Sequence, residues 1–221
     1  MRRYDSLGFM LAEAEYEPDE VFAGHFFCNP LVLAASGINL IAGACVTMSN
    51  AIVLSIIMLV LLPVVGLVAS LEDRRLSPAV RPAVYAVISV AVTIMLAVLC
   101  NTVVSQSADA LGVFLPLAAL DTVVFVRISD EAPSFAPLNS MAAGLGTACS
   151  FASLALPTAL IREFFGGGSI FGKYVFDGVE ALQRPFCGFI LCGFALAIIK
   201  QRSVTRSLRE IEYEPTYDEE E

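Results

Sequence analysis

LGVFLPLAALDTVVFVR, residues 111–127, is the stretch that decides the predicted fold. It is apolar up to Val126, with a proline at Pro116 and a single acidic residue, Asp121. A carboxylate inside a run this apolar is costly in a membrane, so it indicates a functional site. Because proline disrupts a helix interior, we expect residues 111–127 to form a broken or re-entrant membrane helix.

The composition places this stretch in a membrane protein. The chain has 221 residues, of which 57% are apolar and 16% charged, and its mean hydropathy is +0.75. A soluble domain has roughly 45–50% apolar and about 25% charged residues. Several apolar runs approach the ~20 residues that cross ~30 Å of hydrocarbon. These features favour an all-α polytopic membrane protein over the alternative, the apolar core of an α/β enzyme.

Three parts are expected along the chain. An acidic cytoplasmic N-terminal arm covers residues 1–29, a six-helix membrane domain covers residues 30–200, and an acidic cytoplasmic tail covers residues 201–221. The net charge of -9 comes largely from the two ends, which argues against a nucleic-acid partner. Both ends contain the word EYEP, so they are either solvated tails or docking motifs for a basic partner. The expected membrane segments are residues 30–48, 51–71, 83–104, 111–127, 138–161 and 186–199.

The distribution of Lys and Arg predicts the orientation of these six segments. If the segments alternate, only three basic residues fall on the outer side, namely Arg162, Lys173 and Arg184. All other basic residues fall on the inner side, which places both termini in the cytoplasm. Six segments divide into two halves of three, and an odd number per half makes the repeat inverted. We therefore expect a 3+3 inverted repeat.

Each half of this repeat begins with an irregular segment. The first, residues 29–46, is interrupted by Gly37 and Asn39, and the second carries Pro116 and Asp121. Discontinuous helices at matching positions of two halves indicate a binding site near the bilayer midplane. We expect the midpoints of the two segments to face each other, with Gly37 and Pro116 causing the breaks.

Five sequence words, in order across about residues 28–200, resemble the integral membrane subunits of the Rnf/Nqr family. The resemblance is to the E-type subunit of Rnf and the D-type subunit of Nqr. The words are NPLVL (residues 29–33), GIN (37–39), LGVFLPL (111–117), MAAGLG (141–146) and IREFFGGGSIFG (161–172).

The resemblance implies a subunit of a complex in the prokaryotic plasma (inner) membrane. Such complexes pass electrons from ferredoxin or NADH to an acceptor such as NAD or quinone and export Na⁺ or H⁺. The resemblance also implies a paralogous six-helix membrane subunit as partner, alongside the other subunits of the complex. In the family, a 2Fe–2S cluster is held between the two subunits by cysteine thiolates of the broken helices.

This chain departs from the family pattern at both cysteine positions. The family has roughly Gly-Leu-Cys-Pro in the first broken helix and Thr-Asn-Cys in the second, where this chain has Asn39 and Thr122. Iron–sulfur clusters need soft thiolate ligands, and an amide and a hydroxyl are poor substitutes. The nearest thiol, Cys45, lies six residues beyond Asn39, or about 9 Å along a helix. We predict that the chain has no cluster of its own, and the six cysteines are interpreted as packing residues.

Other polar residues have more than one interpretation. Asp121 either caps a half-helix that begins at Thr122 or binds an ion or proton with Asn39 and Thr122, and the two roles are compatible. Asn39 itself satisfies freed backbone groups in the structural interpretation. Arg162 and Glu163 are expected to be interfacial anchors at a helix end. No catalytic residue and no metal site is predicted.

Two functions remain in competition at this stage. The first is a non-catalytic or electron-relay subunit of an Rnf/Nqr-like ion-translocating oxidoreductase. The second is a non-redox membrane protein of the same fold that acts in ion passage or complex assembly. The missing thiols favour the second for the chain alone, and the intact framework favours the first.

Overall fold

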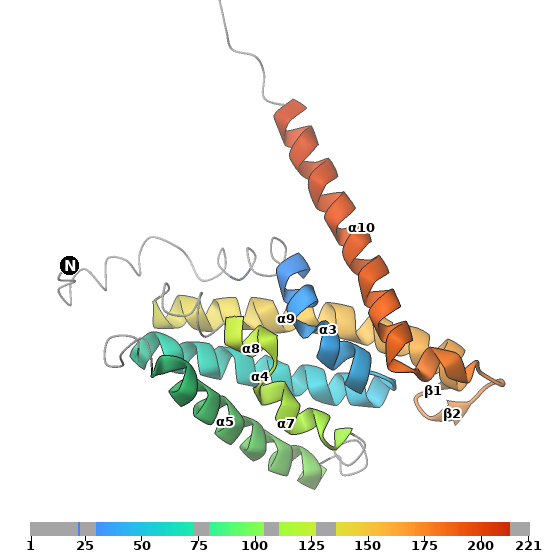
Figure 1. Cartoon of the computed structure of the whole chain (residues 1–221), viewed down its shortest axis with the longest axis horizontal. Coiled ribbons are helices and arrows are strands. Elements are labelled where there is room, and N and C mark those ends of the chain that lie inside the picture. The colour runs from blue at the N-terminus through green and yellow to red at the C-terminus, as the bar shows by residue number, and fades with distance from the viewer. Residues whose placement is uncertain (1–21, 23–29, 73–79, 104–110, 127–135, 213–221) are drawn as a thin grey trace, which may run out of the picture.

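The computed structural model describes residue 22 and residues 30–72, 80–103, 111–126 and 136–212. The described chain is almost entirely helical (Figure 1), which confirms the all-α prediction. The predicted arm, residues 1–29, lies outside these residues apart from residue 22, as does the end of the predicted tail. The elements in order are α3 (Pro30–Ala44), α4 (Met48–Glu72), α5 (Arg81–Val103), α7 (Phe114–Ala119), α8 (Thr122–Val126), α9 (Pro137–Ile161), the π-helix η3 (Arg162–Gly166), strands β1 (Ser169–Ile170) and β2 (Lys173–Tyr174), the 3₁₀-helix η4 (Glu180–Gln183) and α10 (Pro185–Glu212).

Three of the described helices are long and apolar enough to cross a membrane by length and composition. They cover residues 48–71, 82–100 and 137–166. Two shorter apolar helical stretches cover residues 114–125 and 185–198. α3 has 15 residues, which is about 22 Å at 1.5 Å per residue, less than the hydrocarbon thickness. The six predicted segments thus each correspond to helix, while the 3+3 inverted repeat and the number of spans stay predictions.

The pair α4 and α9 forms the centre of the bundle, and the two helices lie side by side in Figure 1. Gly144 of α9 allows this close approach, because a Cβ there would lie 2.8 Å from Cα of Pro63 in α4. The Ser140 hydroxyl donates a hydrogen bond of 2.9 Å to the carbonyl oxygen of Gly66. Lipid provides no hydrophobic drive for helix association, so helices associate through the close packing that small residues allow. The small residues at Ser140 and Gly144 therefore allow α9 to pack closely on α4.

The short helices pack on this pair. α3 contacts α4, α7, α8, α9 and α10. Its contact with α10 is a close backbone approach, because a Cβ on Gly188 would lie 2.7 Å from Cα of Ala42. α5 contacts α7, where the Ser89 hydroxyl donates a 2.8 Å hydrogen bond to the carbonyl oxygen of Ala119. These contacts place α3 and α5 on either side of the interrupted segment α7–α8.

The predicted causes of the helix breaks are wrong. α3 is continuous through Gly37, and the glycine serves close packing instead: a Cβ there would lie 3.0 Å from Cγ2 of Val123. A glycine inside a helix costs roughly 1 kcal/mol, which such a contact offsets. Pro116 is the third residue of α7, where a missing N–H breaks no helical hydrogen bond. The second segment is broken as expected, but between Ala119 and Thr122.

The chain beyond α9 forms a tight cap and a long helix. The cap is a β1–β2 hairpin in which Ser169 pairs with Tyr174. The Tyr174 hydroxyl donates to Oδ1 of Asp177, and this hydrogen bond raises the pKa of the exposed tyrosine. α10 then points away from the bundle (Figure 1) and runs to Glu212, so helix continues through the predicted boundary at residue 200.

Candidate functional site at the helix break

The interruption between α7 and α8 consists of two residues, Leu120 and Asp121. Leu120 ends α7 with φ −107° and ψ 12°, and its N–H bonds to the carbonyl oxygens of Leu117 and Ala118. The chain then restarts as α8, with the N–H of Val124 bonded to the carbonyl oxygen of Asp121 at 3.0 Å. A helix that stops and restarts inside an apolar run leaves backbone groups that need partners.

Asp121 supplies partners at the start of α8. Its carboxylate accepts hydrogen bonds from the backbone N–H groups of Thr122 and Val123. An aspartate in this position satisfies orphan donors and suits the positive end of the helix. This is the geometry that the capping interpretation of Asp121 predicts. The side chain is 7% exposed, and its other oxygen, Oδ2, has no hydrogen-bond partner among the described residues.

α3 packs across this break, in agreement with the prediction that the two irregular segments face each other. Gly37 contacts Val123, the second residue of α8, and Gly43 lies against the ring of Phe114 at the start of α7. The three residues of the predicted ion site differ in their surroundings: Asp121 is buried, whereas Asn39 and Thr122 are exposed on the isolated chain. An ion role for the three together stays a prediction.

The residues at the two positions that the family resemblance assigns to cluster cysteines do not fit an iron–sulfur cluster. Asn39 and Thr122 provide an amide and a hydroxyl, and neither is the soft ligand that iron–sulfur clusters use. The nearest thiol, Cys45, is fully buried in the apolar core beyond the end of α3. Within the part of the chain that the structure describes, no three His, Cys, Asp or Glu side chains gather as metal ligands.

A second polar feature lies at the other end of α3, around Arg162. This arginine begins the π-helix η3 and is 0% exposed. Its Nη1 donates to the carbonyl oxygens of Ala42 at 2.8 Å and Cys45 at 3.1 Å, at the C-terminal end of α3. Nη2 donates to the carbonyl oxygen of Gln183 at 2.7 Å, and Nε to that of Leu182 at 3.3 Å. The guanidinium thus neutralises orphan carbonyls at the negative end of α3 and ties them to η4.

Glu163 does the complementary task for α4. Its Oε2 accepts a hydrogen bond from the N–H of Met48, the first residue of α4. Its Oε1 accepts one of 2.9 Å from the N–H of Gly172 in the hairpin. A carboxylate suits the positive end of a helix, as a guanidinium suits the negative end. Arg162 and Glu163 therefore form a clamp, here called the Arg–Glu clamp, on the turn between α3 and α4.

The expectation that Arg162 and Glu163 are interfacial anchors is wrong. Both side chains are buried, because carbonyls and N–H groups of the α3–α4 turn surround them. Sequence reasoning missed this role since their partners around the α3–α4 turn, Ala42, Cys45 and Met48, are more than 110 positions away. The one signal in the sequence was the word IREFFGGGSIFG itself, whose glycines allow the cap to fold tightly. At Gly168, φ is +59° and a Cβ would overlap the carbonyl oxygen of Phe176.

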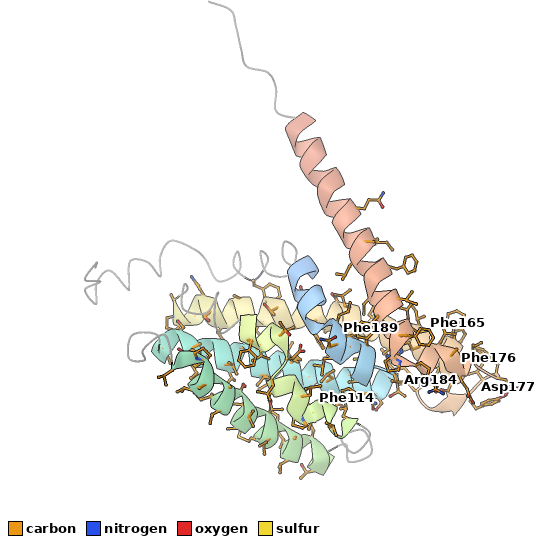
Figure 2. The ribbon with its side chains drawn as sticks, viewed as in Figure 1. Phe114, Phe165, Phe176, Asp177, Arg184 and Phe189 are labelled. Atoms are coloured by element: carbon orange, nitrogen blue, oxygen red, sulfur yellow. The ribbon has the colours of Figure 1, made fainter. Side chains whose placement is uncertain are left out.

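The described side chains around the clamp are shown in Figure 2, where Phe165, Phe176 and Arg184 mark the end of the bundle that carries the hairpin. Phe164 packs edge-to-face on Phe165 and Phe176, with ring centroids 4.9 Å and 5.2 Å away. Cys192 of α10 is buried and lies 4.0 Å from the Thr158 hydroxyl. The described cysteines are free thiols, and burial of Cys45 and Cys192 agrees with a packing role.

These features define a class: a helical membrane protein in which a short apolar helix, α3, packs against an interrupted helix, α7–α8. Comparison of the sequence with protein-family models identifies the family within this class. The family model described as "Rnf-Nqr subunit, membrane protein" matches residues 19–201. The chain belongs to the Rnf-Nqr subunit family, as the five sequence words predicted.

Relatives with known roles agree with this assignment. The chain is 26% identical over 176 residues to the E-type subunit of the proton-translocating ferredoxin:NAD(+) oxidoreductase complex of Clostridium ljungdahlii, with 78% of this chain and 83% of that protein covered. It is 25% identical over 181 residues to the D-type subunit of the Na(+)-translocating NADH-quinone reductase of Shewanella halifaxensis, with 78% and 86% covered. The similarity supports a membrane subunit of an ion-translocating electron transport complex.

Proposed function

We propose that the chain is the E/D-type membrane subunit of an Rnf/Nqr-like complex that couples oxidation of ferredoxin or NADH to export of Na⁺ or H⁺. The observation that carries this proposal is the contact between α3 and the α7–α8 break, at Gly37 and Val123. It keeps the paired irregular helices of the family although the thiols are absent. The complex would lie in the prokaryotic inner membrane with both termini of this chain in the cytoplasm.

The subunit acts in this proposal without a cluster of its own. Asn39 and Thr122 are exposed on the isolated chain, on the two segments that meet at Gly37 and Val123. Exposed amide and hydroxyl groups in an apolar segment need polar partners. A paralogous six-helix subunit would cover them, in the arrangement that the family resemblance implies.

A second candidate is supported by the lost thiols. A non-redox member of the same fold would keep the Arg–Glu clamp and the break while serving ion passage or complex assembly. The clamp depends on hydrogen bonds to helix ends and not on any redox group, so it is equally compatible with this role.

Purification of the tagged full chain from its native membrane separates the two candidates. The first predicts co-purification with a homologous membrane subunit and flavin- or iron-bearing subunits. Purification with no redox subunit would refute it and favour the second candidate.

The cluster assignment has its own control. The double variant N39C/T122C restores both family thiols, so the purified complex is expected to gain iron and a new electron paramagnetic resonance signal relative to wild type. The single variant N39C, with only one thiol restored, is the matched control. A wild-type chain that already binds the cluster would show no such gain and would contradict the proposal.

A further inference from the structure

The inference concerns the free oxygen of Asp121, which capping of α8 leaves unused. One side of the carboxylate accepts the N–H groups of Thr122 and Val123, while Oδ2 is buried without a partner among the described residues. A cap needs only the first of these oxygens. The fold therefore uses only one oxygen of this buried acid, and the other oxygen is available for binding.

The neighbouring polar atoms do not complete a metal site. The hydroxyl of Ser89, on the helix that contacts α7, donates to the carbonyl oxygen of Ala119 and also contacts that of Ala86 at 3.0 Å. Thr93 donates to the carbonyl oxygen of Ser89 at 2.8 Å. These hydroxyls are engaged with backbone groups, and hard metal cations need a shell of several oxygen ligands. Among the described residues, the other buried side-chain oxygen without a partner is the Ser55 hydroxyl of α4. Two such oxygens fall short of a cation's ligand shell, so the free oxygen of Asp121 suits one proton instead.

Among the residues that the structure describes, no charged side chain is placed to replace that proton. The described helices that pack most extensively on α7 and α8 are α3, α4 and α5, and α3 contains no titratable residue. Glu72 is the last residue of α4 and Arg81 the first of α5, so both lie at helix ends. Tyr85 donates its hydroxyl proton to the carbonyl oxygen of Ala69, and Cys100 lies near the far end of α5. The titratable residues of the contacting described helices are these four.

We propose that Asp121 is a proton-binding site at the break between α7 and α8, and that it takes up a proton and not a metal cation. A buried carboxyl group without a counter-charge is stabilised by neutralisation, and the protonated oxygen then becomes a donor. Release of that proton leaves a carboxylate held by the α8 N–H groups. The biological role of this proton site rests on the proposed function, because ion export would give the proton a route across the membrane.

The test is carbodiimide labelling of the full complex in native membranes, followed by peptide mass spectrometry. Lipid-soluble dicyclohexylcarbodiimide modifies protonated carboxyl groups in apolar surroundings. Asp121 is expected to be labelled, and labelling is expected to fall about tenfold per pH unit once the acid ionises. Sodium chloride is expected to have no effect compared with choline chloride. Glu163 is the internal control, because it is 3% exposed but both of its oxygens accept backbone hydrogen bonds.

Each outcome decides the matter. Protection by sodium would overturn the assignment in favour of a metal cation. Absence of label at Asp121, or equal labelling of Asp121 and Glu163, would overturn the proposal as well. Infrared difference spectra between acid and alkaline pH provide a second readout: a carboxylic acid C=O band is expected in wild type and absent in Asp121→Asn, which keeps a cap oxygen. These results do not depend on which subunits co-purify, so failure here is distinguishable from failure of the proposed function.

Discussion

Replacement of Arg162 by methionine tests the Arg–Glu clamp most directly. The change removes four donated hydrogen bonds, of which the two shortest measure 2.7 and 2.8 Å. A hydrogen bond to a charged group contributes about 1.5–3 kcal/mol, so loss of these two alone costs about 3–6 kcal/mol. For a chain of this size each kcal/mol corresponds to roughly 2–4 °C. We therefore expect Arg162→Met to lower the melting temperature by about 6–24 °C.

Thermal unfolding in detergent with a thiol-reactive fluorescent dye measures this effect. Cys45 and Cys192 report on it, because they are 0% and 2% exposed and become reactive when the region around Arg162 opens. The matched control is Arg184→Met. Arg184 follows η4 and is exposed, so its replacement should change the melting temperature little. Arg162→Lys should recover part of the loss, because a lysine keeps the charge but not the planar fork of donors. Equal melting temperatures for Arg162→Met and Arg184→Met would refute the reasoning.

Three further predictions use the same dye assay. Glu163→Ala leaves two backbone N–H groups unpaired and should cost about 2–6 kcal/mol, with Glu163→Gln closer to wild type. Equal losses in the two variants would contradict the role of Glu163 at the start of α4. Gly168→Ala places a Cβ on the backbone carbonyl of Phe176 and should disrupt the fold around the hairpin. The control is Gly172→Ala at φ +74°, where the new Cβ meets no atom within 4 Å, so the variant should cost only its backbone strain, about 1–2 kcal/mol. Gly144→Ala should separate α4 from α9 at a cost of about 1–3 kcal/mol, whereas Gly193→Ala, with nothing within 4 Å, should be neutral or stabilising; the reverse order would refute the packing of these helices.

Much of the architecture followed from local pattern. Apolar runs of membrane length predicted the long helices, because crossing hydrocarbon demands uninterrupted internal hydrogen bonding. The small side chain at Gly144 is likewise visible in the sequence, and the structure uses it for the close approach of α4 and α9. The run of residues 111–127 was expected to be a broken helix, and the structure shows its interruption between α7 and α8.

The positions of the breaks did not follow from local pattern. Gly37 has the sequence appearance of a helix breaker, yet its missing side chain admits Val123 and the helix continues. Pro116 interrupts a helix only when a preceding turn exists, and α7 begins just before it. Glycine and proline permit a helix to break, and the residues packed around them decide whether the break occurs.

By itself, the sequence determined that the chain is a helical membrane protein of the Rnf-Nqr family and that it contains an interrupted helix at residues 111–127. The absence of cluster thiols at Asn39 and Thr122 stays a prediction from the family resemblance. Tertiary structure alone decided what the charged residues do. Arg162 and Glu163 bind helix ends that lie more than 110 residues earlier in the chain, and Asp121 turns one oxygen to α8 and leaves the other buried and free. The physical reason is that burial and hydrogen bonding depend on groups brought together by folding, which no periodicity along the chain records.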